Sequence, residues 1–282
     1  MGSVEASGIR TFLRRRNALR AGRIPPPYSA RAENALLFSA GVFPQNEQVF
    51  DRFSEVYLEA AAKCDALAWW DVATQGEILR TYCARATLVQ MTSLEPYFTA
   101  PPWSRKLRGK RVLVVSPFAA TVQRQYAKRR ALWRHTEVLP EFELKTIRAP
   151  LSAGIAPSEN ADWFETLDKI TQKMDEADYE VALIGAGAFS LPLAVHAKSR
   201  GKVGVHLGGP LQILFGIIGA RWENRPDFKP FFNENWCRPS AEETPMEFRR
   251  AWSSDARKTA TIGSIAKRDE PSAAASSQPP TR

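Results

Sequence analysis

One stretch, residues 179–222, constrains the fold more than any other because it alternates apolar runs with glycine turns. Its first run, Val181–Ile184, contains no polar residue, which is typical of a strand buried on both faces of a sheet. Residues 189–199 predict a helix, and residues 203–207 predict a second strand. A strand, a helix and a second strand in so short a stretch predict a parallel βαβ unit.

Each predicted strand of this stretch ends in a pair of glycines. Gly185 and Gly187 follow the first strand, and Gly208 and Gly209 follow the second. Glycine lets backbone N–H groups approach a ligand closely, and ligands of open parallel sheets bind at the carboxyl ends of the strands. The pattern therefore predicts a binding site, with tight turns of no further function as the alternative.

The rest of the chain continues the alternation of strands and helices. Strands are predicted at residues 65–70, 87–91, 111–115 and 142–147. Helices are predicted at residues 46–63, 74–84, 119–133 and 160–177, with a short aromatic helix at residues 228–236. This order predicts an α/β, Rossmann-like fold whose largely parallel sheet is flanked by helices.

Composition suggests where the domain begins and ends. We predict a single α/β domain over residues 28–245, between two segments whose composition is typical of tails. Residues 1–27 are rich in arginine and end in three prolines, so we expect a disordered basic tail there, with an amphipathic targeting peptide as the alternative. Residues 246–282 are rich in serine, alanine, proline and basic residues, which predicts a second disordered tail.

The formal net charge of +9 favours anionic partners such as phosphates, nucleotides or a membrane surface. The basic clusters are not interleaved with aromatic residues, so we expect no specific nucleic-acid binding. No apolar run is long enough to span a bilayer and no signal-peptide core is present, which predicts a cytoplasmic protein. Contact with a membrane surface stays open. The three cysteines and three histidines are scattered and form no metal-binding spacing.

Several long motifs carry a family resemblance. They are AGVFPQNEQVFDRFSEVYLEAAAKCDALAWW, PWSRKLRGKRVLVVSPFAATVQRQY, LPEFELKTIRAP, ALIGAGAFSLPLAVHAKSRGKVGVHLGGPLQILFGIIGARW and NENWCRPSAEETP. Together they resemble a largely uncharacterised family that accompanies polysaccharide biosynthesis and has the GT-D glycosyltransferase fold. The resemblance implies transfer of a sugar from a nucleotide-sugar donor, in polysaccharide or glycoconjugate synthesis.

The same resemblance implies a metal-binding signature near the amino end. GT-D enzymes hold Mn²⁺ or Mg²⁺ with acidic residues, and the metal neutralises the departing diphosphate. In this chain the signature would fall on residues 28–33, where Tyr28 and Ala30 replace its arginine and glycine and only Glu33 is kept. We therefore assign no metal ligand. A nucleotide- or sugar-binding or scaffold protein of the same fold, without catalysis, is the alternative function.

The candidate site residues follow from these patterns. Glu33, which the resemblance implies, and His206, which can act as a base near neutral pH, are the candidate catalytic residues. The candidate substrate-binding residues lie at predicted strand ends or on the segments that follow them: Ser116, Pro117, Gly185, Gly187, Ser190, Gly208, Gly209, Gln212 and Arg221. A dinucleotide site is not predicted, because Ser190 occupies the third glycine position of the G-x-G-x-x-G pattern.

Overall fold

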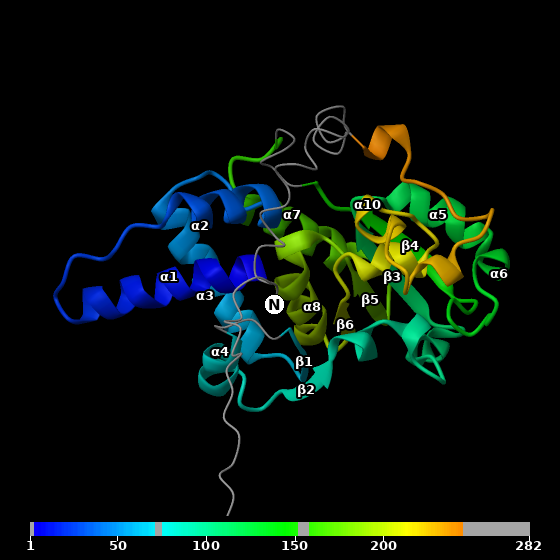
Figure 1. Cartoon of the computed structure of the whole chain (residues 1–282), viewed down its shortest axis with the longest axis horizontal. Helices are drawn as coiled ribbons and strands as arrows, with labels where there is room; N and C mark the ends of the chain where they lie inside the picture. The colour runs from blue at the N-terminus through cyan, green and yellow to red at the C-terminus, as the bar shows by residue number, and fades with distance from the viewer. Residues whose placement is uncertain (1–2, 71–74, 152–157, 245–282) are drawn as a thin grey trace, which may run out of the picture.

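The computed structural model describes residues 3–70, 75–151 and 158–244 (Figure 1). Its centre is a four-stranded sheet built from β3 (Arg111–Ser116), β4 (Glu143–Arg148), β5 (Val181–Ile184) and β6 (Val203–His206). The strand order is β4-β3-β5-β6, and every pair is parallel. The prediction of an α/β, Rossmann-like fold with a parallel sheet is confirmed.

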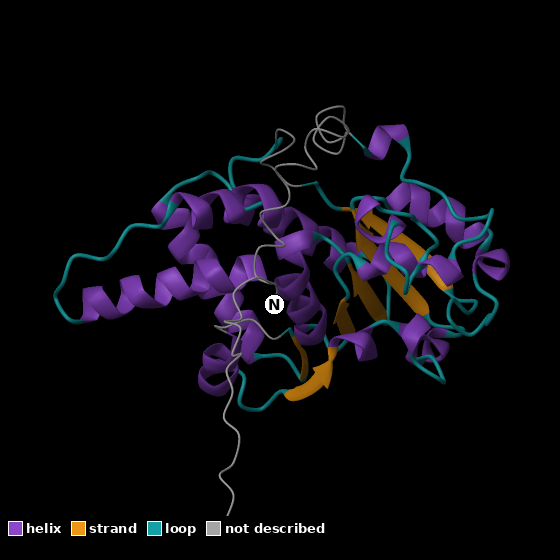
Figure 2. Cartoon of the chain, in the orientation of Figure 1, coloured by secondary structure: helices purple, strands orange, loops and turns teal. Residues whose placement is uncertain are grey.

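The two central strands are apolar because both of their faces are covered. On one face, Val112 and Val114 of β3 belong to a core cluster with α5 (Ala119–Ala127), α6 (Arg129–Leu132) and α9 (Pro210–Leu214). On the other face, Leu113 and Val115 belong to a second cluster beneath most of the remaining helices. Figure 2 shows the strands lying between these helices. A layer of helices on each face explains the unbroken apolar runs in the sequence.

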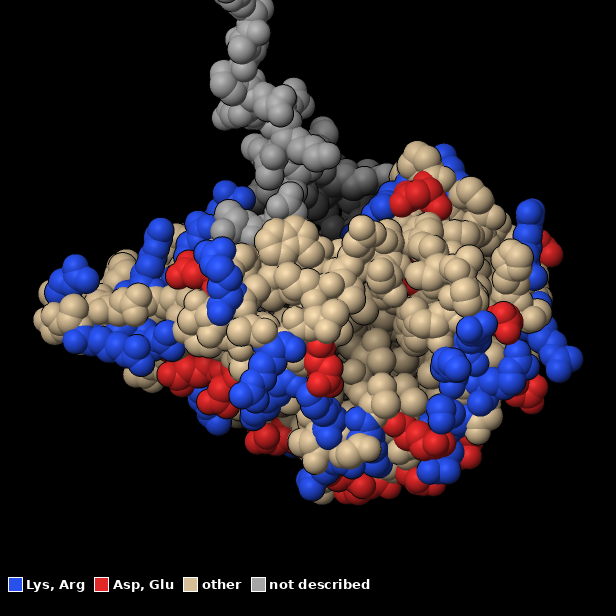
Figure 3. Space-filling view, turned by 90° about the horizontal axis from the view of Figure 1, so that it is seen from below, with Lys and Arg blue, Asp and Glu red and all other residues tan. Residues whose placement is uncertain are grey.

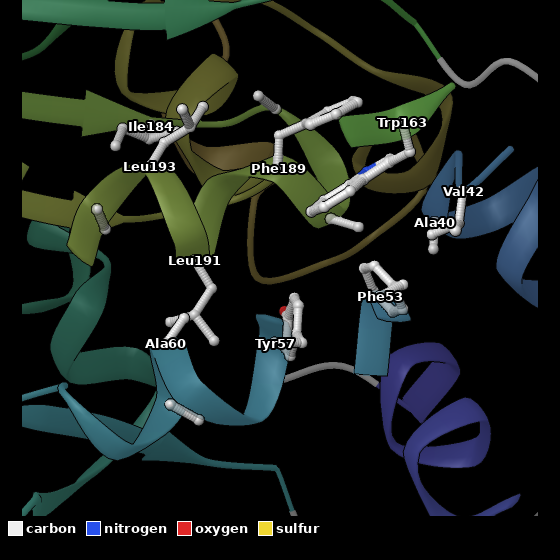
Figure 4. Close-up of a cluster of buried hydrophobic side chains, with 14 of the residues drawn as sticks. Ala40, Val42, Phe53, Tyr57, Ala60, Trp163, Ile184, Phe189, Leu191 and Leu193 are labelled. Carbon is white, nitrogen blue, oxygen red and sulfur yellow. The ribbon is translucent and has the colours of Figure 1, made fainter. Parts of the chain in front are cut away.

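The second core cluster, called the aromatic core cluster below, contains a group of aromatic side chains around Trp163. Its helices include α3 (Glu47–Ala62), α7 (Trp163–Glu176) and α8 (Ser190–Ser199). The ring of Trp163 stacks on Phe189 with centroids 5.0 Å apart and meets the edge of Phe53 at 5.1 Å (Figure 4). Aromatic side chains bury more area than other residues, so this contact ties α3 and α7 to the start of α8.

A separate, two-stranded parallel sheet lies beside the main one. It consists of β1 (Ala66–Trp69) and β2 (Thr87–Gln90), which are joined through α4 (Gln75–Tyr82). All three elements were predicted from the sequence. The remaining elements are short: α2 (Ala30–Asn34), α10 (Ala220–Glu223), the π-helix η1 (Ala35–Ala40), and the 3-10 turns η2 (Met91–Leu94), η3 (Pro96–Phe98), η4 (Trp103–Leu107), η5 (Gly187–Phe189), η6 (Lys229–Phe231) and η7 (Ala241–Glu243).

The prediction of a disordered tail at residues 1–27 is wrong for the part that is described. Helix α1 (Ser3–Arg20) buries Ile9, Phe12 and Leu13 in the aromatic core cluster. Arg15 is also buried, and its guanidinium lies 3.0 Å from the Asp51 carboxylate and 2.9 Å from that of Glu47, both on α3. The two carboxylates of α3 neutralise Arg15. The arginine-rich segment can therefore pack against the domain as helix α1.

Two predicted helices differ from what is observed. The helix expected at residues 119–133 is divided at Lys128 into α5 and α6. The aromatic helix expected at residues 228–236 is one 3-10 turn, η6, which ends where the backbone becomes extended at Phe232. The tail expected at residues 246–282 lies outside the described residues. Among the described residues, no helix is both long and apolar enough to cross a membrane.

Candidate functional site

The order of the strands creates a crevice between β3 and β5. From β3 the chain moves to β4 on one side, and it then returns past β3 to β5 and β6 on the other side. Ligands of open parallel sheets bind where the connections diverge in this way, outside the carboxyl ends of the strands. The segments at this point are residues 116–118, at the end of β3, and residues 185–187, after β5. The N–H of Gly185 donates to the Val115 carbonyl at 2.9 Å, which holds the two strand ends together.

A cavity of about 780 Å³ opens at this crevice. It is lined by most of the predicted binding residues: Ser116, Pro117, Gly185, Gly187, His206, Gly208, Gly209, Gln212 and Arg221. These residues come from three parallel strands and from the segment after β6, so the fold brings together residues that are up to 105 positions apart (221 − 116). Figure 3 shows a hollow near the middle of one face of the molecule, where most of the surface belongs to uncharged residues.

Two predicted site residues do not line the cavity. Glu33 lies on α2, where its carboxylate accepts a hydrogen bond from Gln45 Nε2 at 3.1 Å. Ser190 is fully buried, and its hydroxyl accepts a hydrogen bond from the Ala186 N–H at 2.8 Å. Ser190 therefore stabilises the glycine turn from within the protein core, by its hydrogen bond to Ala186. The structure does not bring Glu33 together with His206 and Arg221.

The two turns require glycine for close approach at Gly185 and for backbone conformation at Gly187 and Gly208. A Cβ atom on Gly185 would lie 2.6 Å from the Gly208 carbonyl oxygen, so the turns after β5 and β6 touch through their backbones. Gly187 and Gly208 have φ of 57° and 62°, in the left-handed region that favours glycine. The backbone N–H groups of Gly187 and Gly209 donate to no acceptor within the described residues, so a ligand can use them.

His206 ends β6 and lies in the wall of the cavity. Its imidazole makes no hydrogen bond with the described residues, and a Cβ atom on Gly208 would lie 3.6 Å from its Nε2. Burial lowers the pKa of His206 to about 3, so the ring is neutral at neutral pH. A base with so low a pKa removes protons weakly, whereas a neutral imidazole can still hydrogen-bond to a ligand. Binding therefore suits His206 better than proton abstraction, and its catalytic role stays a prediction.

The low pKa of His206 predicts a pH dependence of stability. The folded ring stays unprotonated, but in the unfolded chain the same residue binds a proton below its ordinary pKa, so acid favours unfolding. Between about pH 7 and pH 5 we expect the free energy of unfolding to fall by about 2 kcal/mol more in the native protein than in His206→Gln. Urea unfolding of both proteins at the two pH values measures this difference. Equal losses would contradict the prediction.

Arg221 is one of the cations that line the cavity, and its guanidinium lies against Gly209 in the second glycine turn. Its guanidinium carbon lies 4.1 Å from the centre of the Trp222 ring, and it makes no ion pair with any described residue. Partial desolvation by the surrounding residues of the cavity lowers the pKa of Arg221, and repulsion from Arg225 lowers it further. Part of the side chain is still exposed to solvent. A guanidinium keeps its charge in such surroundings. Since nearby Arg225 and Arg238 are paired with Asp227 and Glu223, Arg221 stands out as a cation available to an anionic ligand.

Polar side chains on the other side of the cavity were not predicted. The cavity continues between the edges of β1 and β6, where Glu5, Lys63, Asp65, Lys198 and Lys202 also line it. The ammonium of Lys198 lies 2.6 Å from the Asp65 carboxylate, so these two charges balance each other. The sequence predicts β1 as a strand but contains no signal that this strand faces β6 across a cavity.

The acidic residues of the cavity do not fit a divalent metal. Within the described ranges, no group of three or more His, Cys, Asp or Glu residues is placed to hold a metal ion. The acids in the wall are Glu5 and Asp65, and Asp65 is paired with Lys198. Mn²⁺ and Mg²⁺ require several oxygen ligands at short distance. This donor set is too sparse for the metal that the GT-D resemblance implies.

Comparison of the chain with family models, with curated proteins and with solved structures finds no match. The resemblance to the GT-D family therefore stays a prediction.

Proposed function

We propose that this protein binds a nucleotide sugar in the cavity, as a glycosyltransferase does. The observation that carries the proposal is that Arg221, a cation without an ion-pair partner among the described residues, faces the same cavity as both glycine turns. An anionic diphosphate needs cationic and N–H donors, and Arg221 with the N–H groups of Gly187 and Gly209 would supply them. A volume of about 780 Å³ lies within the range of small-molecule sites.

The remaining residues of the cavity suit the other parts of such a ligand. The wall is largely apolar, with Phe118, Leu191, Leu211 and Trp222 among its residues, and these can pack against a base or a sugar ring. The neutral imidazole of His206 can hydrogen-bond to a hydroxyl of the ligand. Gln212 contributes less, because its amide already donates to the Ile217 carbonyl at 3.2 Å.

Transfer of the sugar to an acceptor, in polysaccharide or glycoconjugate synthesis, is the reaction that we propose for this site in the cytoplasm. Arg221 would then stabilise the negative charge of the leaving diphosphate. A second function, binding without catalysis, is favoured by one specific observation. Glu33, the single acid kept from the implied signature, is bonded to Gln45 outside the cavity.

Calorimetry with a panel of nucleoside diphosphates and nucleotide sugars tests the proposal. We expect at least one nucleotide sugar to bind, with an affinity that does not change when Mn²⁺ is added, because the cavity lacks a set of metal ligands. Absence of binding across the panel, in protein shown to be folded by circular dichroism, would contradict the proposal. Hydrolysis or transfer of the bound sugar then distinguishes an enzyme from a binding protein.

A further inference from the structure

The end of α1 and the loop after it form an arm, defined here as residues 14–24. Figure 1 shows the arm projecting from the molecule at its left edge, away from the sheet. Helix α1 ends at Arg20, and Gly22, with φ of 66°, begins the return of the chain towards α2. The arm is therefore an exposed extension of a helix whose first half is anchored in the core.

The arm carries uncompensated positive charge. Arg14, Arg20 and Arg23 are exposed and make no ion pair or side-chain hydrogen bond with any residue that the structure describes. The sequence contains no acidic residue between Glu5 and Glu33 that could balance them. Arg15 differs from these arginines, because it is buried against Asp51 and Glu47. The arginines of the arm that lack an ion-pair partner are therefore the ones exposed to solvent.

The tip of the arm is apolar as well as basic. Ile24 is 94% exposed and Leu19 is 59% exposed, the two largest exposed fractions among the large apolar residues described. Figure 3 shows the corresponding tapered end of the molecule, where uncharged atoms at the tip are flanked by Lys and Arg side chains. Transfer of exposed aliphatic side chains from water to an apolar medium is favourable, and attraction between the neighbouring arginines and anions adds to the free energy of binding.

A hollow of about 390 Å³ lies between the helix and the returning loop. Its wall combines two arginines, Arg14 and Arg23, with the apolar residues Ala18, Ile24 and Pro26. An anionic headgroup with an acyl chain attached presents the same two chemistries side by side. The hollow is open to solvent at the surface of the arm, where a headgroup can reach it.

From this combination we propose that the arm docks on an anionic membrane surface, with Arg14, Arg20 and Arg23 at the headgroups and Leu19 and Ile24 inserted between them. Such interfacial binding needs both basic and aliphatic residues at one place. Nucleic acid fits the arm less well, because a phosphate backbone offers no apolar medium to Leu19 and Ile24, and residues 14–24 include no aromatic side chain on which unpaired bases could stack. The proposal is independent of the ligand that the cavity binds.

Sedimentation of the full chain with lipid vesicles tests the proposal. We expect binding to vesicles of equal parts phosphatidylserine and phosphatidylcholine, and none to pure phosphatidylcholine. The triple variant Arg14→Gln, Arg20→Gln, Arg23→Gln should bind about 100-fold more weakly, because each basic residue at an anionic surface contributes a factor of about five. The double variant Leu19→Ser, Ile24→Ser should also bind more weakly, while its charge is unchanged.

A matched control removes the same charge outside the arm. Arg105→Gln, Lys106→Gln, Arg108→Gln changes three exposed basic residues of η4 and its C-terminal end, and it should leave vesicle binding unchanged. The substituted arm residues are exposed, so the melting temperatures of all variants should agree with that of the native protein. Three results with the vesicles would overturn the proposal: no binding to the anionic vesicles, an equal loss in the Arg105, Lys106, Arg108 control, or full binding by the Leu19, Ile24 variant. Binding to duplex DNA as tight as to the vesicles would also overturn it.

Discussion

Gly204→Ala is expected to destabilise the protein by about 3 kcal/mol or more, the largest effect of a single methyl group that the structure predicts. A Cβ atom on Gly204 would lie 2.1 Å from the carbonyl oxygen of Ala194 and 2.7 Å from its carbonyl carbon. Both atoms belong to the backbone of α8, which cannot rotate away as a side chain can. The helix must therefore move off β6 as a body.

Movement of α8 would disturb more than one contact. The helix and the turn before it carry Phe189, Leu191 and Leu193 into the aromatic core cluster, so a shift opens space on both sides of the helix. Urea unfolding measures the effect as a lower midpoint. Val203→Ala is the matched control on the same strand, because Val203 is 56% exposed and its truncation should cost little. A midpoint for Gly204→Ala equal to that of the control would show that α8 tolerates the added methyl group.

Arg221→Ala is expected to weaken binding of the nucleotide sugar, and of pyrophosphate as a simpler probe, by about 100-fold. A guanidinium can make two charge-assisted hydrogen bonds to a diphosphate, each contributing about 1.5 kcal/mol or more. Folding should be nearly unaffected, because Arg221 is exposed and forms no ion pair with the described residues. Calorimetric titration of the native and variant proteins measures the change in affinity.

Two further variants make the Arg221 result specific. Arg221→Lys keeps the charge but loses the paired donors, so we expect an affinity between those of the native protein and Arg221→Ala. Arg238→Ala removes an arginine that is paired with Glu223 and does not line the cavity, and it should leave binding unchanged. Equal weakening by Arg221→Ala and Arg238→Ala would show a general charge effect and would contradict the role given to Arg221.

The strands of the main sheet were predictable because local pattern and tertiary environment agree. The run VALI was predicted as Val181–Ile184, the strand observed, since a strand covered on both faces must be apolar throughout. Gly185 and Gly208 were predictable as turn residues because a side chain is disfavoured at both: a Cβ atom on Gly185 would meet the Gly208 carbonyl, and Gly208 has a left-handed φ. Because the strands are parallel, their carboxyl ends lie at one edge of the sheet. Most of the predicted binding residues follow these ends and therefore line one cavity.

The parts that were missed depend on contacts between distant segments. An arginine-rich amino end taken alone predicts a disordered tail. In the structure Arg15 pairs with Asp51 and Glu47, which follow it by more than thirty positions. Glu33 was proposed from its place in a motif, but its partner Gln45 is set by the way the chain returns after η1. In both cases the deciding contact, an ion pair or a hydrogen bond, joins two elements that are far apart in the sequence. No local sequence pattern shows that these elements pack together.

The strand order has a consequence for how the chain folds as it is synthesised. Strand β3 is complete at residue 116, yet its second neighbour, β5, ends at residue 184, so the ribosome must add 68 more residues (184 − 116) before both edges of β3 can be paired. Until then a valine-rich edge stays open to other nascent chains. Slow translation between β4 and β5 would prolong this exposure, and chaperone binding during synthesis should therefore concentrate on chains whose part outside the ribosome ends between residues 149 and 184.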